Sequence, residues 1–249
     1  MCATLITTNL NENKIWETSE LSASPADYLH QVSLYLPYRR QKFLGFGGAF
    51  TEAAAYCYQQ LPLARTAFLE SYFGQSGLRY SLGRTHINSC DFALGNYACV
   101  EDPEDEALAT FSTERDDQYL IPMIREAQEV AGKPIGLLLS PWSPPAFMKT
   151  NGEMNHGGSL LPAYRARWAA CMAKYAAYYR SKGCDVRRIS IQNEPAATQT
   201  WDSCIYSAEE EGIFAAEFLA PALKEAGCGD IPILAWDHNK DCMVYRVAE

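Results

Sequence analysis

The sequence lacks the patterns that mark a membrane-spanning, secreted or zinc-binding protein. No apolar run approaches the roughly 20 residues that a transmembrane helix needs. Residues 1–20 have neither the cationic start nor the apolar centre of a secretory signal. The nine cysteines are scattered without a Cys-x-x-Cys pair, so zinc spacing is absent. Reduced thiols in a cytoplasmic protein are the simplest interpretation.

Positive charge is also scarce. The chain has 21 Lys and Arg against 30 Asp and Glu, which gives a net charge of −9. This balance argues against a nucleic-acid-binding groove. Hydrophobic residues make up 48% of the 249 residues and charged residues 20%, which is typical of a globular chain long enough for one large domain.

Motifs for several kinds of chemistry are missing. No Gly-x-Ser-x-Gly elbow is present for a serine nucleophile, and Cys57 and Cys90 lack the local signatures of catalytic cysteines. The glycines of residues 45–48 are not followed by a Gly-Lys-Ser/Thr triplet, so close backbone packing under a pocket is favoured over phosphate binding. No close His/Asp/Glu spacing indicates a metal site. We therefore expect neither a metal nor a cofactor.

Strand-like and helix-like segments alternate along most of the chain. Apolar periodicity and terminal signals predict strands over residues 43–50, 78–87, 134–140, 187–193 and 231–236. They predict helices over residues 62–73, 113–131, 162–182 and 207–226. In the third helix, Cys171 and a stripe of Trp168, Met172, Tyr175 and Tyr179 should be core. Such alternation predicts a parallel sheet.

The loops differ in length on the two sides of this sheet. Helix-to-strand turns are short, whereas the strand-to-helix loops 88–111, 141–159 and 194–206 are long and rich in Trp, Asn, His and acids. A (β/α)₈ barrel builds its active site from such loops. A doubly wound sheet is the alternative, but it calls for a glycine-rich turn opening a helix after the first strand, and residues 45–52 fit that poorly. Residues 30–36 also alternate and predict a strand outside the main sheet.

Polar groups gather where the predicted strands end. Ile189 and Ile191 alternate with polar residues, and Pro195 cannot extend the sheet, so Asn193 and Glu194 stand at a strand tip. A solvated loop acid is the alternative for a single Glu. The other residues near strand ends are Glu52, Arg84, His86, Asp91, Trp142, Trp236, Asp237 and His238. Acids, an amide, a guanidinium and indoles suit a sugar, because aromatic faces stack on its C–H surface and polar groups bind its hydroxyls.

Six collinear motifs resemble glycoside hydrolase family 30, the glucosylceramidase-like family. They are residues 45–52, 71–73, 89–92, 140–142, 149–152 and 193–195. The last motif, Asn-Glu-Pro, is shared by many related barrel glycosidases, so the combination over residues 43–240 carries the resemblance. It implies a retaining β-glycosidase on a (β/α)₈ TIM barrel. It also implies an attached β-domain to which residues 1–42 contribute, with residues 43–249 as the N-terminal portion of the barrel.

The resemblance also implies roles for individual residues. Glu194 corresponds to the general acid/base and Asn193 to its partner on the sugar 2-hydroxyl. Glu52, Arg84 and Trp142 correspond to sugar-pocket residues, although the lysosomal member of the family has Asp in place of Glu52. The remaining matches, as pocket residues or supports of the pocket, are Asp91, Asp237 and His238.

The resemblance and the strand count together predict an incomplete enzyme. The sequence predicts five barrel strands where a closed barrel needs eight, and the family's nucleophilic Glu lies at the end of the seventh strand. We expect β-glucoside substrates, either a glucosylceramide-like glycolipid or a β-glucan oligosaccharide, but no turnover by residues 1–249 alone. The alternative is an inactive carbohydrate-binding relative. An open sheet should also expose an unpaired edge and apolar helix faces.

Overall fold

The computed structural model describes residues 3–21, 35 and 37–248, and the chain divides into two units at Phe43. The first unit contains a hairpin of β1 (Ala3–Asn9) and β2 (Lys14–Leu21), joined by the short 3₁₀ helix η1 (Leu10–Glu12). The sequence did not predict this hairpin. The strand expected over residues 30–36 falls, except for Tyr35, outside the described residues.

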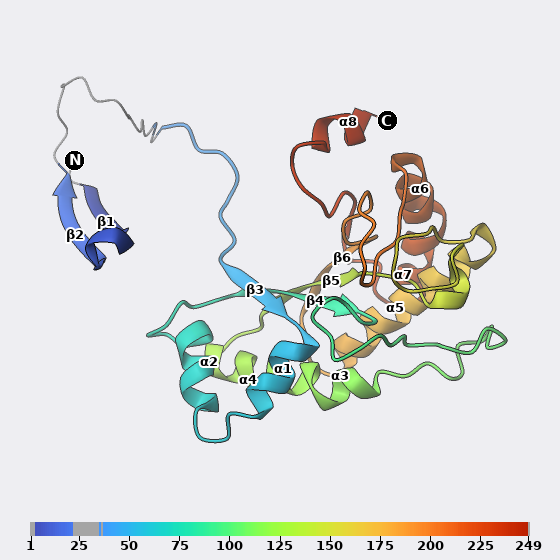
Figure 1. The fold of residues 1–249 in the computed structure, drawn as a ribbon, viewed down its shortest axis with the longest axis horizontal. Helices are drawn as coiled ribbons and strands as arrows, with labels where there is room; N and C mark the ends of the chain where they lie inside the picture. The colour runs from blue at the N-terminus through green and yellow to red at the C-terminus, as the bar shows by residue number, and fades with distance from the viewer. Residues whose placement is uncertain (1–2, 22–34, 36, 249) are drawn as a thin grey trace. The chain divides into compact units, whose positions relative to one another are not determined.

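The second unit is a parallel sheet of five strands with helices between them (Figure 1). The strands follow chain order and are β3 (Gly47–Phe50), β4 (Leu82–Ile87), β5 (Gly136–Pro141), β6 (Val186–Ser190) and β7 (Ile233–Leu234). The helices are α1 (Glu52–Gln59), α2 (Arg65–Phe73), α3 (Glu114–Gln118), α4 (Leu120–Ala131), α5 (Arg165–Ser181), α6 (Ala208–Ile213), α7 (Ala220–Glu225) and α8 (Met243–Ala248). Shorter segments are the 3₁₀ helices η2 (Ala146–Met148) and η3 (Pro162–Tyr164) and the π-helical η4 (Phe214–Leu219). This is the predicted arrangement of an incomplete α/β barrel.

One predicted helix is interrupted, so the prediction of a continuous helix there was wrong, whereas another is continuous as predicted but irregular in its middle. The helix expected over residues 113–131 breaks at Tyr119 between α3 and α4. Pro122 cannot donate to the carbonyl of Gln118 and its ring would clash there, which accounts for the break. The helix expected over residues 207–226 widens into η4 before Pro221, which likewise cannot bond to Glu217.

Other boundaries differ by a few residues, and one helix was missed. Helix α2 begins at Arg65 rather than at residue 62, and β4 begins at Leu82 rather than at residue 78. Helix α1 was not predicted. Its N-terminus is capped by Thr51, whose hydroxyl accepts a hydrogen bond from the Ala54 amide at 3.2 Å.

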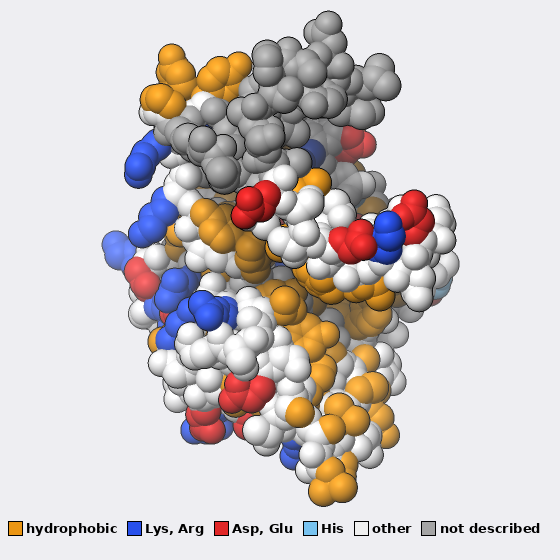
Figure 2. Space-filling view, turned by 90° about the vertical axis from the view of Figure 1, so that its left-hand side faces the viewer, with side chains coloured by type: hydrophobic (Ala, Val, Ile, Leu, Met, Phe, Trp, Pro, Cys, Tyr) orange, Lys and Arg blue, Asp and Glu red, His pale blue; other side chains and the backbone are white. Residues whose placement is uncertain are grey.

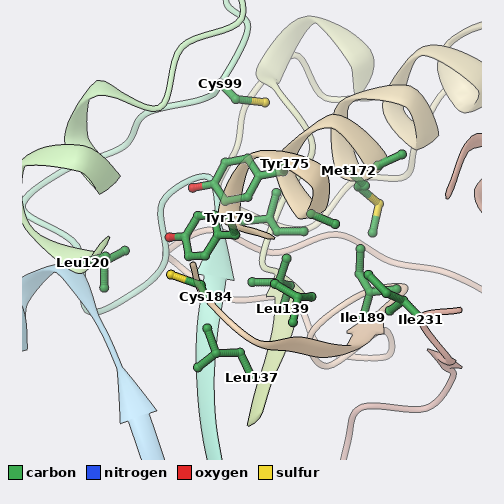
Figure 3. Close-up of a cluster of buried hydrophobic side chains, with 14 of the residues drawn as sticks. Cys99, Leu120, Leu137, Leu139, Met172, Tyr175, Tyr179, Cys184, Ile189 and Ile231 are labelled. Atoms are coloured by element: carbon green, nitrogen blue, oxygen red, sulfur yellow. The ribbon is translucent and has the colours of Figure 1, made fainter. Parts of the chain in front are cut away.

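The core lies between the helices and one face of the sheet, and α5 contributes much of it. Trp168, Met172, Tyr175 and Tyr179 are all fully buried, as their spacing predicted, and so is Cys171. Figure 3 shows Met172, Tyr175 and Tyr179 over Leu137 and Leu139 of β5. The aromatic stripe of α5 is therefore core.

The opposite face of the sheet carries few bulky apolar groups. On β5, Leu137 and Leu139 are buried in the core while Leu138 between them is half-buried on the other face. Leu138, Arg84 and Arg188 line a cavity of about 420 Å³ over this face together with β3 backbone. This face corresponds to the lumen of a closed barrel.

The sheet has two edges, β3 and β7, and neither pairs with a second strand among the described residues. Helices α1, α2 and α4 lie together on one side of it (Figure 1). Figure 2, which views the α2 side, shows hydrophobic side chains at the surface. Exposed residues near α2 include Leu61, Leu63, Tyr72 and Leu78. No helix within the described ranges is long and apolar enough to cross a membrane.

A carboxyl group is buried in the core beside the tyrosines of α5. Asp116 of α3 is fully buried, and its Oδ1 accepts a hydrogen bond from the Tyr179 hydroxyl at 2.7 Å. Its Oδ2 has no partner among the described residues. Burial, reinforced by the charge of Glu52, raises the pKa of Asp116 to about 7.

We expect Asp116→Asn to change the pH dependence of folding. Because the folded-state pKa is above that of an unfolded Asp, the contribution of Asp116 to stability is complete at acidic pH and is lost as pH rises toward 7. The neutral amide cannot ionise, so the variant should gain stability relative to wild type between about pH 4 and pH 7. Urea unfolding across this range, with Asp241→Asn at an exposed position as control, measures the difference. Parallel stability curves for Asp116→Asn and wild type would contradict it.

Candidate active site

The predicted site residues come from the carboxyl ends of several strands. All five strands of the second unit run in parallel, so their carboxyl ends share one edge of the sheet. Arg84 lies within β4, Trp142 directly follows β5, and Asn193 follows β6. Asp237 follows β7 and pairs with Asn193 as an isolated parallel bridge. Side chains far apart in the chain therefore converge.

Arg84 is the centre of this convergence. Its Nη2 donates to Asn193 Oδ1 at 2.7 Å, to Asp237 Oδ2 at 2.8 Å and to Ser140 Oγ at 3.0 Å. Its guanidinium lies over the Trp142 ring, 4.4 Å from the ring centroid. Four of the predicted residues are thus joined in one cluster, the Arg84 cluster: Arg84, Trp142, Asn193 and Asp237.

Ser140 is bonded to the Arg84 cluster and was missed as a site residue. Its hydroxyl also donates to Asp237 Oδ2. In the structure Leu138 lies opposite Arg84, and Ser140 two residues further on faces the same side as Arg84. The period of two within the predicted strand was the only sequence signal for this. A small hydroxyl next to Pro141 and Trp142 leaves room for the guanidinium.

The backbone of Glu194 is fixed by both neighbouring strands. The Asn193 amide donates to Pro141 O at 2.7 Å, and the Glu194 amide donates to Asp237 O at 2.9 Å. Glu194 has a φ of 47°, in the left-handed region that a non-glycine residue rarely adopts. Such a conformation costs on the order of 1–3 kcal/mol and persists where surrounding contacts determine it, as at many functional sites.

The Glu194 carboxylate is half-buried, and no hydrogen bond joins it to another described group. Asp91 lies near enough for the two charges to interact. Loss of solvation, reinforced by the charge of Glu194, raises the pKa of Asp91, while a hydrogen bond with Trp142 opposes the rise. Asp91 and Trp142 therefore border the space in front of Glu194.

Glu52 is engaged elsewhere. Its fully buried carboxylate accepts hydrogen bonds from Arg115 Nε and Nη2, each at 2.6 Å, and from the Leu94 amide at 2.7 Å. Its own amide donates to His86 Nε2 at 3.1 Å. No described contact joins Glu52 to the Arg84 cluster, and its contact with a sugar stays a prediction.

Arg115 is the partner that the sequence did not indicate. It lies on α3, far along the chain from Glu52, and its guanidinium stacks over Tyr97 at 4.4 Å. Together Arg115 and Glu52 fasten α3 to the start of α1 and to the loop after β4. No sequence spacing predicts such a pair, since it depends on the folded position of both helices.

His238 is not joined to the Arg84 cluster either. Its ring stacks on Trp236 at a centroid distance of 4.8 Å, and Nδ1 accepts from the Asn239 amide at 2.8 Å. Its buried Nε2 has no partner among the described residues. The pocket role assigned to His238 stays a prediction.

The alternative chemistries find little support in the described part of the chain. No group of three or more His, Cys, Asp or Glu side chains there could hold a metal ion. Cys57 is exposed. Burial raises the pKa of the Cys90 thiol to about 12, so the reactive thiolate is not populated at neutral pH.

The fold and the site are those of an α/β-barrel protein. A carboxylate, an amide, a guanidinium and an indole lie at the carboxyl end of its strands. The model of the glycosyl hydrolase family 30 TIM-barrel domain matches residues 43–246. The chain belongs to this family.

Relatives and solved structures agree with this assignment. The chain is 33% identical over 210 residues to the lysosomal acid glucosylceramidase of Mus musculus, covering 80% of this chain and 41% of that protein. It is 31% identical over 211 residues to an endo-1,6-beta-D-glucanase of Neurospora crassa, covering 82% and 44%. The crystal structure of SrfJ from Salmonella typhimurium matches with a TM-score of 0.90 and 39% identity, covering 100% of this chain and 56% of that one. The chain thus spans about half the length of the proteins it matches.

We expect Trp142→Ala to reduce stability only modestly. The indole is half-buried and contacts Arg84 and Asp91 rather than the core. Trp168→Ala is the matched control, because the Trp168 side chain is fully buried and its truncation should cost roughly 3–5 kcal/mol. Urea denaturation of both variants gives the comparison. An equal loss of stability in the two would indicate that Trp142 is a packing residue.

Proposed function

We propose that the protein is a retaining β-glycosidase in which Glu194 is the general acid/base. The observation that carries this proposal is the position of Asn193 and Glu194 at the end of β6, fixed between Pro141 and Asp237 beside the Arg84 cluster. The Glu194 carboxylate makes no hydrogen bond within the described residues and can therefore approach a glycosidic oxygen. Membership of a glycosidase family supports the same role.

The proposed reaction needs two carboxylates about 5–5.5 Å apart. Glu194 protonates the leaving oxygen while a nucleophilic carboxylate attacks the anomeric carbon, and a covalent glycosyl-enzyme forms. Glu194 then removes a proton from the water that hydrolyses this intermediate. Asn193 lies next to Glu194, where its amide can bind the sugar 2-hydroxyl, and the Trp142 ring offers an apolar face to the sugar.

The substrate class we propose is a β-glucoside. Two matched proteins support it by their names, a glucosylceramidase and an endo-1,6-beta-D-glucanase. Both a glucosylceramide-like glycolipid and a β-glucan oligosaccharide present a glucose unit to such a site. The cytoplasmic location expected from the cysteine pattern stays a prediction.

We expect Glu194→Gln to remove most of the activity in a form of the protein extended to the length of its relatives. Lost acid/base catalysis should lower turnover by about 10²–10⁴. A substrate with a very good leaving group should lose less in its first step, and azide should restore part of the second step by replacing water. Kinetics with aryl β-glucosides of graded leaving-group pKa measure this. Glu209→Gln, at an exposed position of α6, is the control; unchanged turnover in Glu194→Gln would remove Glu194 from the role.

We further propose that residues 1–249 alone do not turn over a β-glucoside. The described sheet has five strands and a closed barrel has eight. Of the described acids, Asp91 interacts with the charge of Glu194 and Asp237 accepts a hydrogen bond from its backbone amide. Asp237 is bound to Arg84 and Ser140. The nucleophile is then supplied by polypeptide that the matched proteins have outside the aligned part.

A chromogenic β-glucoside should therefore report no hydrolysis with the 249-residue chain and hydrolysis with the extended form. Binding of glucose-derived ligands by the 249-residue chain without hydrolysis would fit a carbohydrate-binding role for this part. Robust hydrolysis by the 249-residue chain that disappears in Glu194→Gln would instead require a nucleophile within it, with Asp91 as the first candidate.

A further inference from the structure

Lys149 is a buried lysine whose ammonium contacts only backbone carbonyls. It opens the motif of residues 149–152 and is 3% exposed. Its Nζ donates to Ser203 O at 2.6 Å and to Met154 O at 2.9 Å. No carboxylate forms an ion pair with it among the described residues. Burying an ammonium group is costly unless hydrogen bonds compensate for the lost water. Here the two carbonyls supply that compensation, and the ammonium links them.

The two carbonyls belong to different loops. Met154 lies between β5 and α5, and Ser203 lies between β6 and α6. The Ser203 amide also donates to Met154 O at 3.1 Å. The Ser203 hydroxyl accepts from the amides of Gly157 at 2.9 Å and Gln199 at 3.1 Å. Lys149 and Ser203 therefore form the centre of a polar junction between these loops.

A third loop reaches the same junction through Asp202. Its Oδ1 accepts from the Ser89 hydroxyl at 2.6 Å and from Asn96 Nδ2 at 3.1 Å. Ser89 and Asn96 lie in the loop after β4, which also carries Asp91. The loops after β4, β5 and β6 are thereby fastened to one another.

The junction fixes the far end of the segment that carries Glu194. At the near end, Gln192 Nε2 donates to Trp142 O and the Asn193 amide donates to Pro141 O, each at 2.7 Å. The Tyr206 amide donates a hydrogen bond to Pro195 O at 2.9 Å, which joins the two ends of the loop after β6. Residues 192–206 are thus attached at both ends to the loop after β5. At the distal end the backbone bonds of His156 to Gln199 O at 2.9 Å and of Ile205 to Gly158 O at 2.7 Å take part, and Lys149 contributes the charged side-chain attachment.

We propose that Lys149 is a positioning residue, which holds the loop after β6 so that Glu194 keeps its left-handed backbone and its direction toward the substrate. This inference rests on the proposed role of Glu194. Charged donors make stronger hydrogen bonds than neutral ones, and one ammonium can bind both carbonyls at once. Burial lowers the pKa of Lys149 to about 8, so the ammonium persists at neutral pH.

The chain offers a matched control for this lysine. Lys174 of α5 donates to a single carbonyl, Leu108 O, at 2.7 Å and lies over the Phe111 ring. It fastens the loop before α3, away from Glu194. Lys149→Met and Lys174→Met each remove an ammonium from a backbone carbonyl and keep most of the apolar stem, and only the first should affect the Glu194 segment.

Amide hydrogen exchange on the 249-residue chain tests the positioning directly. In Lys149→Met, the amides of Gln199 and Ser203 should exchange about tenfold faster or more, as the loss of charged hydrogen bonds implies. The increase should extend to the amides of Glu194 and Ala197, while Lys174→Met leaves those amides at the wild-type rate. Faster exchange that stops at Met154 and Ser203, or that is equal in both variants, would overturn the proposal.

Kinetics of the extended form supply the second measurement. At a temperature where both variants are folded, Lys149→Met should lower kcat by about ten- to hundredfold for a poor leaving group, with less effect on KM. With a good leaving group the loss should be smaller and partly restored by azide, because displacement of Glu194 impairs the same proton transfers as its removal. A loss of thermal stability alone, without azide rescue, would overturn the proposal.

A second variant covers the case in which Lys149→Met does not fold. Ser203→Ala removes the hydroxyl that binds the amides of Gly157 and Gln199 but leaves Lys149 in place, and it should give the same pattern in milder form. Absence of any Glu194-dependent hydrolysis in the wild-type extended form would refute the proposed function instead. The exchange result would then still decide whether Lys149 orders the segment.

Discussion

The carboxyl end of the sheet depends on one guanidinium. Arg84 extends from β4 and binds groups that follow or end three other strands, namely Ser140, Asn193 and Asp237. Without it the Asn193 side-chain oxygen would have no partner among the described residues, and Asp237 Oδ2 would keep only the Ser140 hydroxyl. All three contacts are made by the one nitrogen Nη2. The Trp142 ring also packs against the flat face of the Arg84 guanidinium, and a lysine ammonium has no such face to stack.

Glu52 and Glu194 both lie near strand ends, but their surroundings give them different roles. Glu52 is fully buried and neutralised by Arg115, so it holds the start of α1 against the loop after β4. Glu194 has no such partner among the described residues and is left accessible. Two glutamates that follow strands in the same way thus differ because a cation lies beside one of them. Glu52 therefore has a structural role, whereas the Glu194 carboxylate is free to contact a substrate.

Much of this arrangement could be predicted from the sequence. The alternation of apolar patterns predicted the five strands, most of the helices and a parallel sheet, and it placed Arg84, Trp142, Asn193 and Asp237 near strand ends. The break at Tyr119 was also readable, since Pro122 excludes a continuous helix, but the amphipathic pattern over residues 113–131 concealed it. The Glu52–Arg115 pair and the Lys149 junction were not predictable. The first joins two helices and the second joins loops, and in both cases the whole fold rather than local spacing decides the distance between the segments.

Strand order in the sheet is identical to chain order from β3 to β7. A chain emerging from the ribosome can therefore add each βα unit to an edge that has already formed. No strand is inserted between two strands that precede it in the chain, so each pairing joins neighbours in sequence order. The growing edge is always the most recent strand. Strand β7, with only two paired residues, presents a short ladder at that edge, and a short edge strand offers little template for pairing with another nascent chain.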